Sequence, residues 1–306
     1  MALPRDRIED INIQTSFEIL EGRTCGYVDY EIISLGKNSQ MEIRIYNCED
    51  KMVSFCCGKR GRAVIEDAKL WEIHQGNLYR FQVRMLNEKH RCVDEYEQMI
   101  GVRTVEIKNQ KLLLNNKEIY LKGFGRHEDA PFSGRAYNSV VQKKDFELMK
   151  WCGANSFRTS HYPYSEEVLQ MADKEGFLVI GETAAVGMQD FDGNWLDPSC
   201  DSSGRYFGNQ EVRLQGRENH VKHIEHMIAR DKNHPCIIMW SLMNEPDCSD
   251  TGAEDYYNTV FKTAKKADPQ KRPGSFTIHT SVGRDCIYWD LCDVVMLNKY
   301  NGWYFE

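Results

Sequence analysis

The chain has no apolar run of 18 residues, which excludes an ordinary transmembrane helix. Its opening residues, Met-Ala-Leu-Pro-Arg-Asp-Arg, lack the apolar stretch of a secretory signal peptide. Basic residues are not in excess, because 39 Lys and Arg stand against 46 Asp and Glu and the net charge is −7. We therefore expect neither nucleic acid nor a membrane as a partner.

Several common site signatures are also missing. No GxSxG motif is present, so the sequence does not indicate a serine hydrolase of the α/β type. Gly58-Lys-Arg-Gly61 is too short to be a P-loop. No two cysteines have the CxxC spacing of a zinc site, and His127-Glu128-Asp129 alone is weak evidence for a metal.

Cysteine, in contrast, is plentiful, and the spacing of the cysteines does not suggest disulfide pairs. The chain has 11 cysteines, an odd number, scattered singly apart from Cys56-Cys57. Several follow or precede large apolar residues, as Cys236 does before Ile237, and free cysteine often behaves as a small buried hydrophobe. The pattern favours a reducing compartment, the cytoplasm, over an exported disulfide protein.

Residues 1–102 have the pattern of an all-β domain. Apolar and polar residues alternate in short segments separated by turn signals, which is typical of a β-sandwich. The segments expected to be strands are Ile11–Phe17, Val28–Ile33, Met41–Tyr46 and Leu78–Arg84.

Residues 103–306 have a different pattern, in which strands alternate with amphipathic helices. The expected strands are Glu118–Gly123, Ala154–Arg158, Phe177–Gly181, Ile237–Leu242, Ser275–His279 and Val294–Leu297. The expected helices are Gln142–Trp151, Ser165–Glu175, Glu211–Asp231 and Ala253–Ala267, with a long loop at Met188–Gln210. A closed TIM barrel needs eight β/α units. We therefore predict a multidomain protein, a β-sandwich followed by a (β/α)₈ TIM barrel truncated after about six strands.

The strongest candidate site is Asn244-Glu245. The apolar run Cys236–Trp240 leads into it, so Glu245 is expected at the carboxyl end of a buried strand, where barrels keep their catalytic residues. A Glu there suits a general acid/base, and an Asn beside it suits binding of a sugar hydroxyl. An ordinary loop Glu is the competing interpretation, although Trp240 and Pro246 suit a shaped sugar site.

Further polar residues follow the other expected strands. His127 could bind substrate or lie in a solvated loop, and His161 could contact sugar hydroxyls or be held structurally. Arg158 lies within a strand and needs a carboxylate partner, such as Glu245 or Glu182. Glu182 is either a second catalytic carboxylate or, as we prefer, half of a supporting ion pair.

Two other groups are more ambiguous. His220, His223 and His226 share a stripe of one expected helix, where a polar surface is the default and a metal site the alternative. Residues Asn298–Tyr304 follow the sixth strand, and their aromatic side chains suit either a sugar site or an exposed core.

Five motifs in this order closely resemble the β-glucuronidases of glycoside hydrolase family 2. They are Gly123–Ala130, Arg158–Tyr164, Gly181–Gly187, Ile228–Pro235 and Trp240–Asp247. The resemblance covers the family's immunoglobulin-like sandwich and the first six units of its catalytic barrel. It implies a retaining exo-hydrolase that removes terminal β-D-glucuronic acid from a small-molecule or oligosaccharide β-glucuronide.

The resemblance also implies roles for individual residues. Glu245 matches the acid/base and Asn244 the residue that holds the sugar 2-hydroxyl. His161, Tyr300 and Tyr304 match substrate-binding residues, and the role of His127 is less defined. A further set supports the site, namely Arg158, Glu182 and Trp240. The implied mechanism needs no metal and no organic cofactor.

The chain departs from the family in two ways. It lacks the leading jelly-roll domain, and it ends at Glu306 before the stretch that supplies the nucleophile and the later Asn-x-Lys motif. We therefore expect this chain to be inactive alone. The alternatives are a β-galactosidase-like or galacturonidase-like member of the family and a non-catalytic carbohydrate-binding module, and a homo-oligomer stays open.

Overall fold

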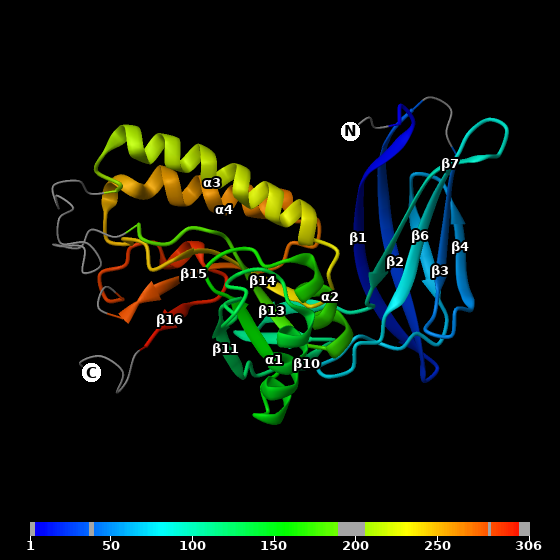
Figure 1. Ribbon diagram of the computed structural model, residues 1–306, viewed down its shortest axis with the longest axis horizontal. Coiled ribbons are helices and arrows are strands. Elements are labelled where there is room, and N and C mark those ends of the chain that lie inside the picture. Colours follow the sequence, from blue (N-terminus) through cyan, green and yellow to red (C-terminus); the bar gives the residue numbers. More distant parts are fainter. Residues whose placement is uncertain (1–3, 37–39, 189–205, 281–282, 300–306) are drawn as a thin grey trace.

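Alternating apolar residues near the amino terminus form two antiparallel sheets that pack face to face. The computed structural model describes residues 4–36, 40–188, 206–280 and 283–299. One sheet has the order β1-β2-β5, with the bounds Arg7–Leu20, Arg23–Leu35 and Arg60–Ile65. The other has the order β4-β3-β6-β7, with the bounds Met52–Cys57, Gln40–Tyr46, Tyr79–Leu86 and Cys92–Ile100. The predicted sandwich is confirmed, and it stands to one side of the molecule (Figure 1).

The inner faces of these sheets follow the period of two that the sequence shows. In β3 the side chains of Met41, Ile43 and Ile45 are buried, and the residues between them are more exposed. They meet Val28 and Tyr30 of the facing sheet in one apolar cluster. Burial of this alternating face is what holds the two sheets together.

A small three-stranded sheet links the sandwich to the barrel. It contains β8, β9 and β10, with the bounds Val105–Lys108, Lys111–Leu114 and Lys117–Glu118. Asn109 and Gln110 both have positive φ, 51° and 61°, which is the requirement of a two-residue hairpin turn. Because this sheet uses Lys117–Glu118, the expected first barrel strand at Glu118–Gly123 is wrong, and that strand begins at Gly123 instead.

The barrel part is a parallel sheet of six strands in consecutive order. Its strands are β11 (Gly123–Arg126), β12 (Ser156–Thr159), β13 (Leu178–Glu182), β14 (Ile237–Asn244), β15 (Gly274–His279) and β16 (Met296–Asn298). Its helices are α1 (Ser139–Trp151), α2 (Glu166–Glu175), α3 (Gln210–Asp231) and α4 (Glu254–Ala267). Each neighbouring pair of strands is parallel, as the predicted partial TIM barrel requires.

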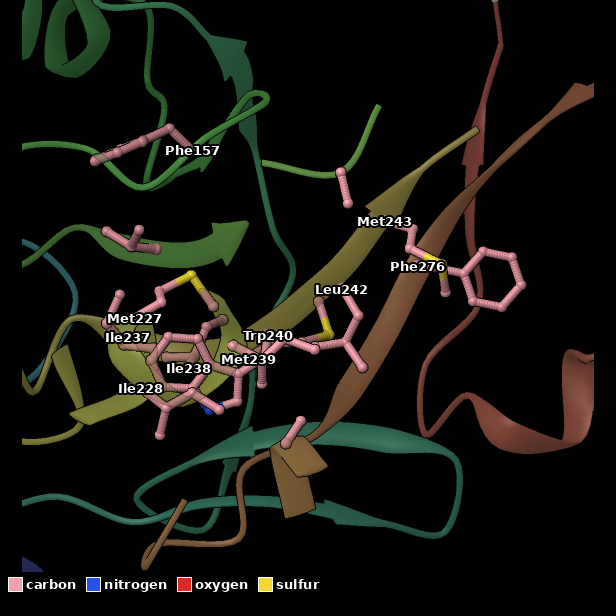
Figure 2. Close-up of a cluster of buried hydrophobic side chains, with 14 of the residues drawn as sticks. Phe157, Met227, Ile228, Ile237, Ile238, Met239, Trp240, Leu242, Met243 and Phe276 are labelled. Carbon is pink, nitrogen blue, oxygen red and sulfur yellow. The ribbon is translucent and has the colours of Figure 1, made fainter. Parts of the chain in front are cut away.

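The strand β14 lies at the centre of the barrel core. All eight of its residues are buried, which explains why it reads as a continuous apolar run rather than an alternating one. Figure 2 shows Trp240, Met239 and Leu242 within this cluster, with Phe276 of the next strand beside Met243. The helices α3 and α4 lie alongside each other over this part of the sheet (Figure 1).

Polar contacts join the sandwich to the barrel. Arg103, at the junction of the two parts, exchanges backbone hydrogen bonds with Thr15 Oγ1 of the sandwich and donates from its side chain to the carbonyl oxygens of Pro235 and Ile237, at 2.7 and 2.8 Å. The Asn233 side chain donates to the carbonyl oxygen of Ile11 at 2.8 Å, and Lys232 forms an ion pair with Asp10. The sandwich and the partial barrel are therefore in direct contact. The predicted boundary between residues 102 and 103 stays a prediction.

Among the described residues, no helix is long and apolar enough to cross a membrane.

Candidate active site

Asn244 and Glu245 lie where β14 ends, at the carboxyl edge of the parallel sheet. Glu245 has a φ of +49°, in the left-handed region that non-glycine residues seldom adopt. Its backbone N–H donates to the carbonyl oxygen of Thr277 at 2.7 Å, and that of Asn244 donates to Ala185 at 2.9 Å. The neighbouring segments therefore fix the turn that carries the Glu245 side chain.

Asn298, at the end of β16, holds the Asn-Glu pair from the side. Its amide nitrogen donates to Glu245 Oε1 at 2.6 Å and to Asn244 Oδ1 at 3.2 Å. The side chain of Glu245 remains half-buried. One neutral amide thus fixes the positions of both polar groups.

Glu182 is the buried centre of a polar cluster at the end of β13. Its side chain has 0% exposure, and its Oε2 accepts a hydrogen bond from Ser241 Oγ at 2.7 Å. Arg158 Nε lies 3.2 Å from Oε2, so the predicted Arg158–Glu182 ion pair is present. His161 Nδ1 lies 2.6 Å from Oε1, and because a carboxylate oxygen accepts, Nδ1 carries the proton. Both oxygens of Glu182 are therefore engaged within the protein.

Arg158 connects this cluster to the Asn244-Glu245 pair. Its guanidinium donates to Thr277 Oγ1, and another nitrogen lies 3.5 Å from Asn298 Oδ1. Arg158 thereby joins Glu182 on β13 to the residue that holds Glu245. A direct role for Arg158 in orienting Glu245, which the sequence also allowed, stays a prediction.

The two histidine candidates lie next to each other. The rings of His127 and His161 meet edge to face with centroids 5.5 Å apart, and the peptide bond before His161 is cis. Burial lowers the pKa of His127, and the neighbouring His161 lowers it further. A neutral His127 is thereby favoured beside the ring of His161.

Trp240 faces the barrel core and not the polar cluster. It is 1% exposed, and its indole nitrogen donates to Asp268 Oδ2 at 2.8 Å. The guanidinium of Arg272 lies over its ring, 4.8 Å from the centroid. Trp240 therefore supports β14 from behind and does not line the cluster around Glu245.

Some candidate residues lie outside the part of the chain that the structure describes. These are Tyr300, Tyr304 and most of the expected loop at Met188–Gln210. Their assignment to the site stays a prediction.

Sequence reasoning missed a hydrogen-bonded relay behind the site. Thr183 follows Glu182, and its hydroxyl donates to the carbonyl oxygen of Leu242 at 2.6 Å. His220 Nε2 lies 3.1 Å from the same hydroxyl, and Nδ1 lies 3.0 Å from the Tyr256 hydroxyl. Since the Thr183 proton goes to Leu242, Nε2 is the donor and Nδ1 accepts from Tyr256. The helical spacing of three did not reveal this, because it groups buried His220 with His223 and His226, which are exposed.

The fold and the cluster define a TIM-barrel class of protein, in which functional side chains gather where parallel strands end. The model of the glycosyl hydrolases family 2 TIM barrel domain matches residues 105–306, and the model described as glycosyl hydrolases family 2 matches residues 7–103. The chain belongs to glycosyl hydrolases family 2.

Curated relatives and solved structures of this family are similar to the chain. A β-glucuronidase of Streptococcus agalactiae is 37% identical over 100% of this chain and 50% of its own length. A β-glucuronidase of Rattus norvegicus is 36% identical over 99% of this chain and 44% of its own length. The structure of a Ruminococcus gnavus β-glucuronidase in complex with C6-substituted uronic isofagomine is 38% identical, with a TM-score of 0.88 over 99% of this chain and 48% of that one. The chain thus spans about half the length of the relatives it matches.

Proposed function

We propose that the chain carries the acid/base part of a retaining exo-β-glucuronidase. Glu245 protonates the glycosidic oxygen as the bond breaks, and then takes a proton from the attacking water. Asn244 holds the sugar 2-hydroxyl, and His161 and His127 line the sugar pocket together with Tyr300 and Tyr304. Support comes from the relatives, which are β-glucuronidases, and from a related structure that contains a uronic isofagomine.

The contrast between two carboxylates carries the assignment. Glu182 is fully buried and accepts hydrogen bonds on both oxygens, so it has no free path to a sugar carbon. Glu245 is half-buried at the edge of the sheet and is positioned by Asn298. Glu182 therefore supports the site, and Glu245 does the proton transfer. Since both oxygens of Glu182 are engaged, we assign the nucleophile to another carboxylate, which a retaining mechanism places about 5–5.5 Å from the acid/base.

The proposal is tested in a complete barrel. Residues 1–306 would replace the matching half of the Streptococcus agalactiae relative, and the folded hybrid would be assayed with alkyl and aryl β-D-glucuronides. We expect hydrolysis, and we expect Glu245→Gln to lower kcat by about 10²–10⁴ for aglycones that need protonation. The loss should be much smaller for aglycones that leave without a proton.

Asp247→Asn is the matched control, since Asp247 lies in the same loop and its carboxylate accepts from Ser249, which an Asn side chain can also do. Its activity should stay near that of the unmodified hybrid. An equal loss for every leaving group would contradict an acid role for Glu245. Binding without hydrolysis would instead favour the carbohydrate-binding module, and faster hydrolysis of β-galactosides or β-galacturonides would favour the neighbouring specificities.

We also keep the cytoplasm as the proposed location. The cysteines of the described part are all free thiols, in agreement with a reducing compartment. Assembly as a homo-oligomer stays a prediction.

A further inference from the structure

A second cluster of chemically active side chains lies away from Glu245, where the barrel meets the sandwich. Asp173 is on α2, and His234 and Cys236 precede β14. A carboxylate oxygen, Nδ1 and Sγ of these residues all lie within 4.8 Å of one another. We propose that Asp173, His234 and Cys236 bind one Zn²⁺ ion, at a site that has no part in the proposed hydrolysis.

The oxygen and nitrogen atoms of the cluster have a spacing close to that of a zinc site, and the sulfur lies within 4.8 Å of both. Asp173 Oδ2 lies 2.5 Å from His234 Nδ1, and Asp173 Oδ1 accepts from the backbone N–H of Cys236 at 2.9 Å. In a tetrahedral zinc site, oxygen and nitrogen ligands about 2.0–2.1 Å from the metal are about 3.3 Å apart. Entry of the ion therefore asks Asp173 and His234 to separate by under about 1 Å. The backbone contact to Oδ1 meanwhile holds the carboxylate in place, as hydrogen bonds around metal sites commonly do.

The donor set selects among metals. A carboxylate oxygen, an imidazole nitrogen and a thiolate sulfur suit Zn²⁺, whereas Mg²⁺ and Ca²⁺ prefer oxygen ligands alone. Two of the three side chains are almost completely buried, with Asp173 at 2% and Cys236 at 0% exposure. The sulfur and oxygen ligands are therefore held away from bulk water, as in structural zinc sites.

Charge is balanced with and without the ion. A carboxylate, a protonated imidazole and a neutral thiol sum to zero. Zn²⁺ with a carboxylate, a neutral imidazole and a thiolate also sums to zero, since the thiol and the imidazole each release one proton to solvent. Exchange of two protons for one Zn²⁺ thus leaves no net charge in a buried region, where an unbalanced charge would be costly.

A cavity gives the ion a way in and leaves room for a fourth ligand. Its volume is about 600 Å³, and Asp173 and His234 line it together with Tyr96, Glu166 and Arg230. A water molecule from this cavity completes the tetrahedron. Because Asp173 belongs to α2 and the other two ligands precede β14, the ion would clip these segments together beside the sandwich.

The competing explanation is that the cluster holds only protons, as a hydrogen-bonded Asp–His pair next to a thiol. Titration of the 306-residue chain with Co²⁺, which reports thiolate ligands by a charge-transfer band in the near ultraviolet, separates the two. We expect one Co²⁺ per chain with this band, and its loss on adding one equivalent of Zn²⁺. Cys236→Ser should abolish the band. Cys248→Ser, at another cysteine with 0% exposure, should leave it unchanged.

Absence of the band in the unmodified chain, or an equal band in Cys236→Ser, would overturn the proposal. X-ray absorption of the zinc-loaded unmodified chain gives an answer even if Cys236→Ser does not fold. We expect one sulfur at about 2.3 Å and the remaining ligands as nitrogen or oxygen at about 2.0–2.2 Å. Two or more sulfurs would place the ion at other cysteines and would equally refute the site. Neither measurement uses hydrolysis, so the outcome is independent of the proposed function.

Discussion

Mild acid should destabilise the chain through one buried histidine, His220. Its ring nitrogens lie between the hydroxyls of Thr183 and Tyr256, and its burial favours the neutral imidazole. Burial lowers the pKa of His220 from 6.5 to about 4. Protonation would place a second N–H against the Tyr256 hydroxyl in a site with little water.

The magnitude follows from linkage between folding and protonation. The pKa in the folded state lies below that of the unfolded chain, so the contribution of His220 to stability is present above pH 6.5 and is lost as the pH falls through about 4. A difference of about 2.5 units corresponds to about 3 kcal/mol in the free energy of unfolding. About 2 kcal/mol of this is lost between pH 7 and pH 5, before most carboxylates titrate.

Urea unfolding of the chain at pH 7 and pH 5 measures this loss. His220→Gln removes the titrating group, so its free energy of unfolding should fall by about 2 kcal/mol less over this range than that of the unmodified chain. His223→Gln, at an exposed position of the same helix, controls for the loss of a histidine. Parallel pH dependence of the unmodified chain and His220→Gln would refute the buried neutral relay.

Two further substitutions test buried charges. Arg158→Met leaves the Glu182 carboxylate, which has 0% exposure, without its cation, and should lower the free energy of unfolding by about 3–5 kcal/mol. The control Arg62→Met, at a side chain that is 56% exposed, should lower it by under about 1 kcal/mol. Equal losses would contradict a buried ion pair. Burial acts to raise the pKa of Asp268, but Arg272 outweighs it and lowers the pKa to about 2, so this carboxylate stabilises the fold above pH 3.8 and loses that effect as the pH falls through 2. In acid titrations followed by circular dichroism, Asp268→Asn should be less stable than the unmodified chain at pH 7 by about 3–5 kcal/mol and should lose less stability below pH 4. The same loss of stability below pH 4 in both proteins would count against this role of Asp268.

The patterns of apolar residues were sufficient to predict both kinds of sheet, because burial on one face leaves an alternation and burial on both faces leaves a continuous apolar run. Strand ends were harder to place. The first barrel strand lies later than expected, since Lys117–Glu118 pairs with β9 and the apolar residues after it form a connection. The strands β4, β5 and β7 were not predicted, because their exposed faces keep residues such as Met52, Phe55 and Tyr96 that blur the alternation.

Some features of the candidate site could likewise be predicted from the sequence, and others could not. The ion pair between Arg158 and Glu182 was predictable because both residues close neighbouring parallel strands, whose carboxyl ends meet at one edge. The hydrogen bonds of Asn298 to Asn244 and Glu245 were not, because they depend on how far β16 extends. His220 was grouped with the exposed residues His223 and His226, since helical spacing alone does not say which residues of one helix face are buried. Trp240 lies in the core because its neighbour Ser241 points toward Glu182.

Trp71 makes the stability of the barrel depend on the segment that joins it to the sandwich. It precedes the predicted boundary, yet its side chain belongs to the barrel core, is 0% exposed and donates its indole N–H to the carbonyl oxygen of Asp173. A barrel separated from its sandwich would carry a vacancy the size of a Trp side chain, at a cost of about 3–5 kcal/mol. A sandwich exchanged for another by recombination would therefore have to supply a large aromatic side chain at the position of Trp71 to keep the barrel core filled.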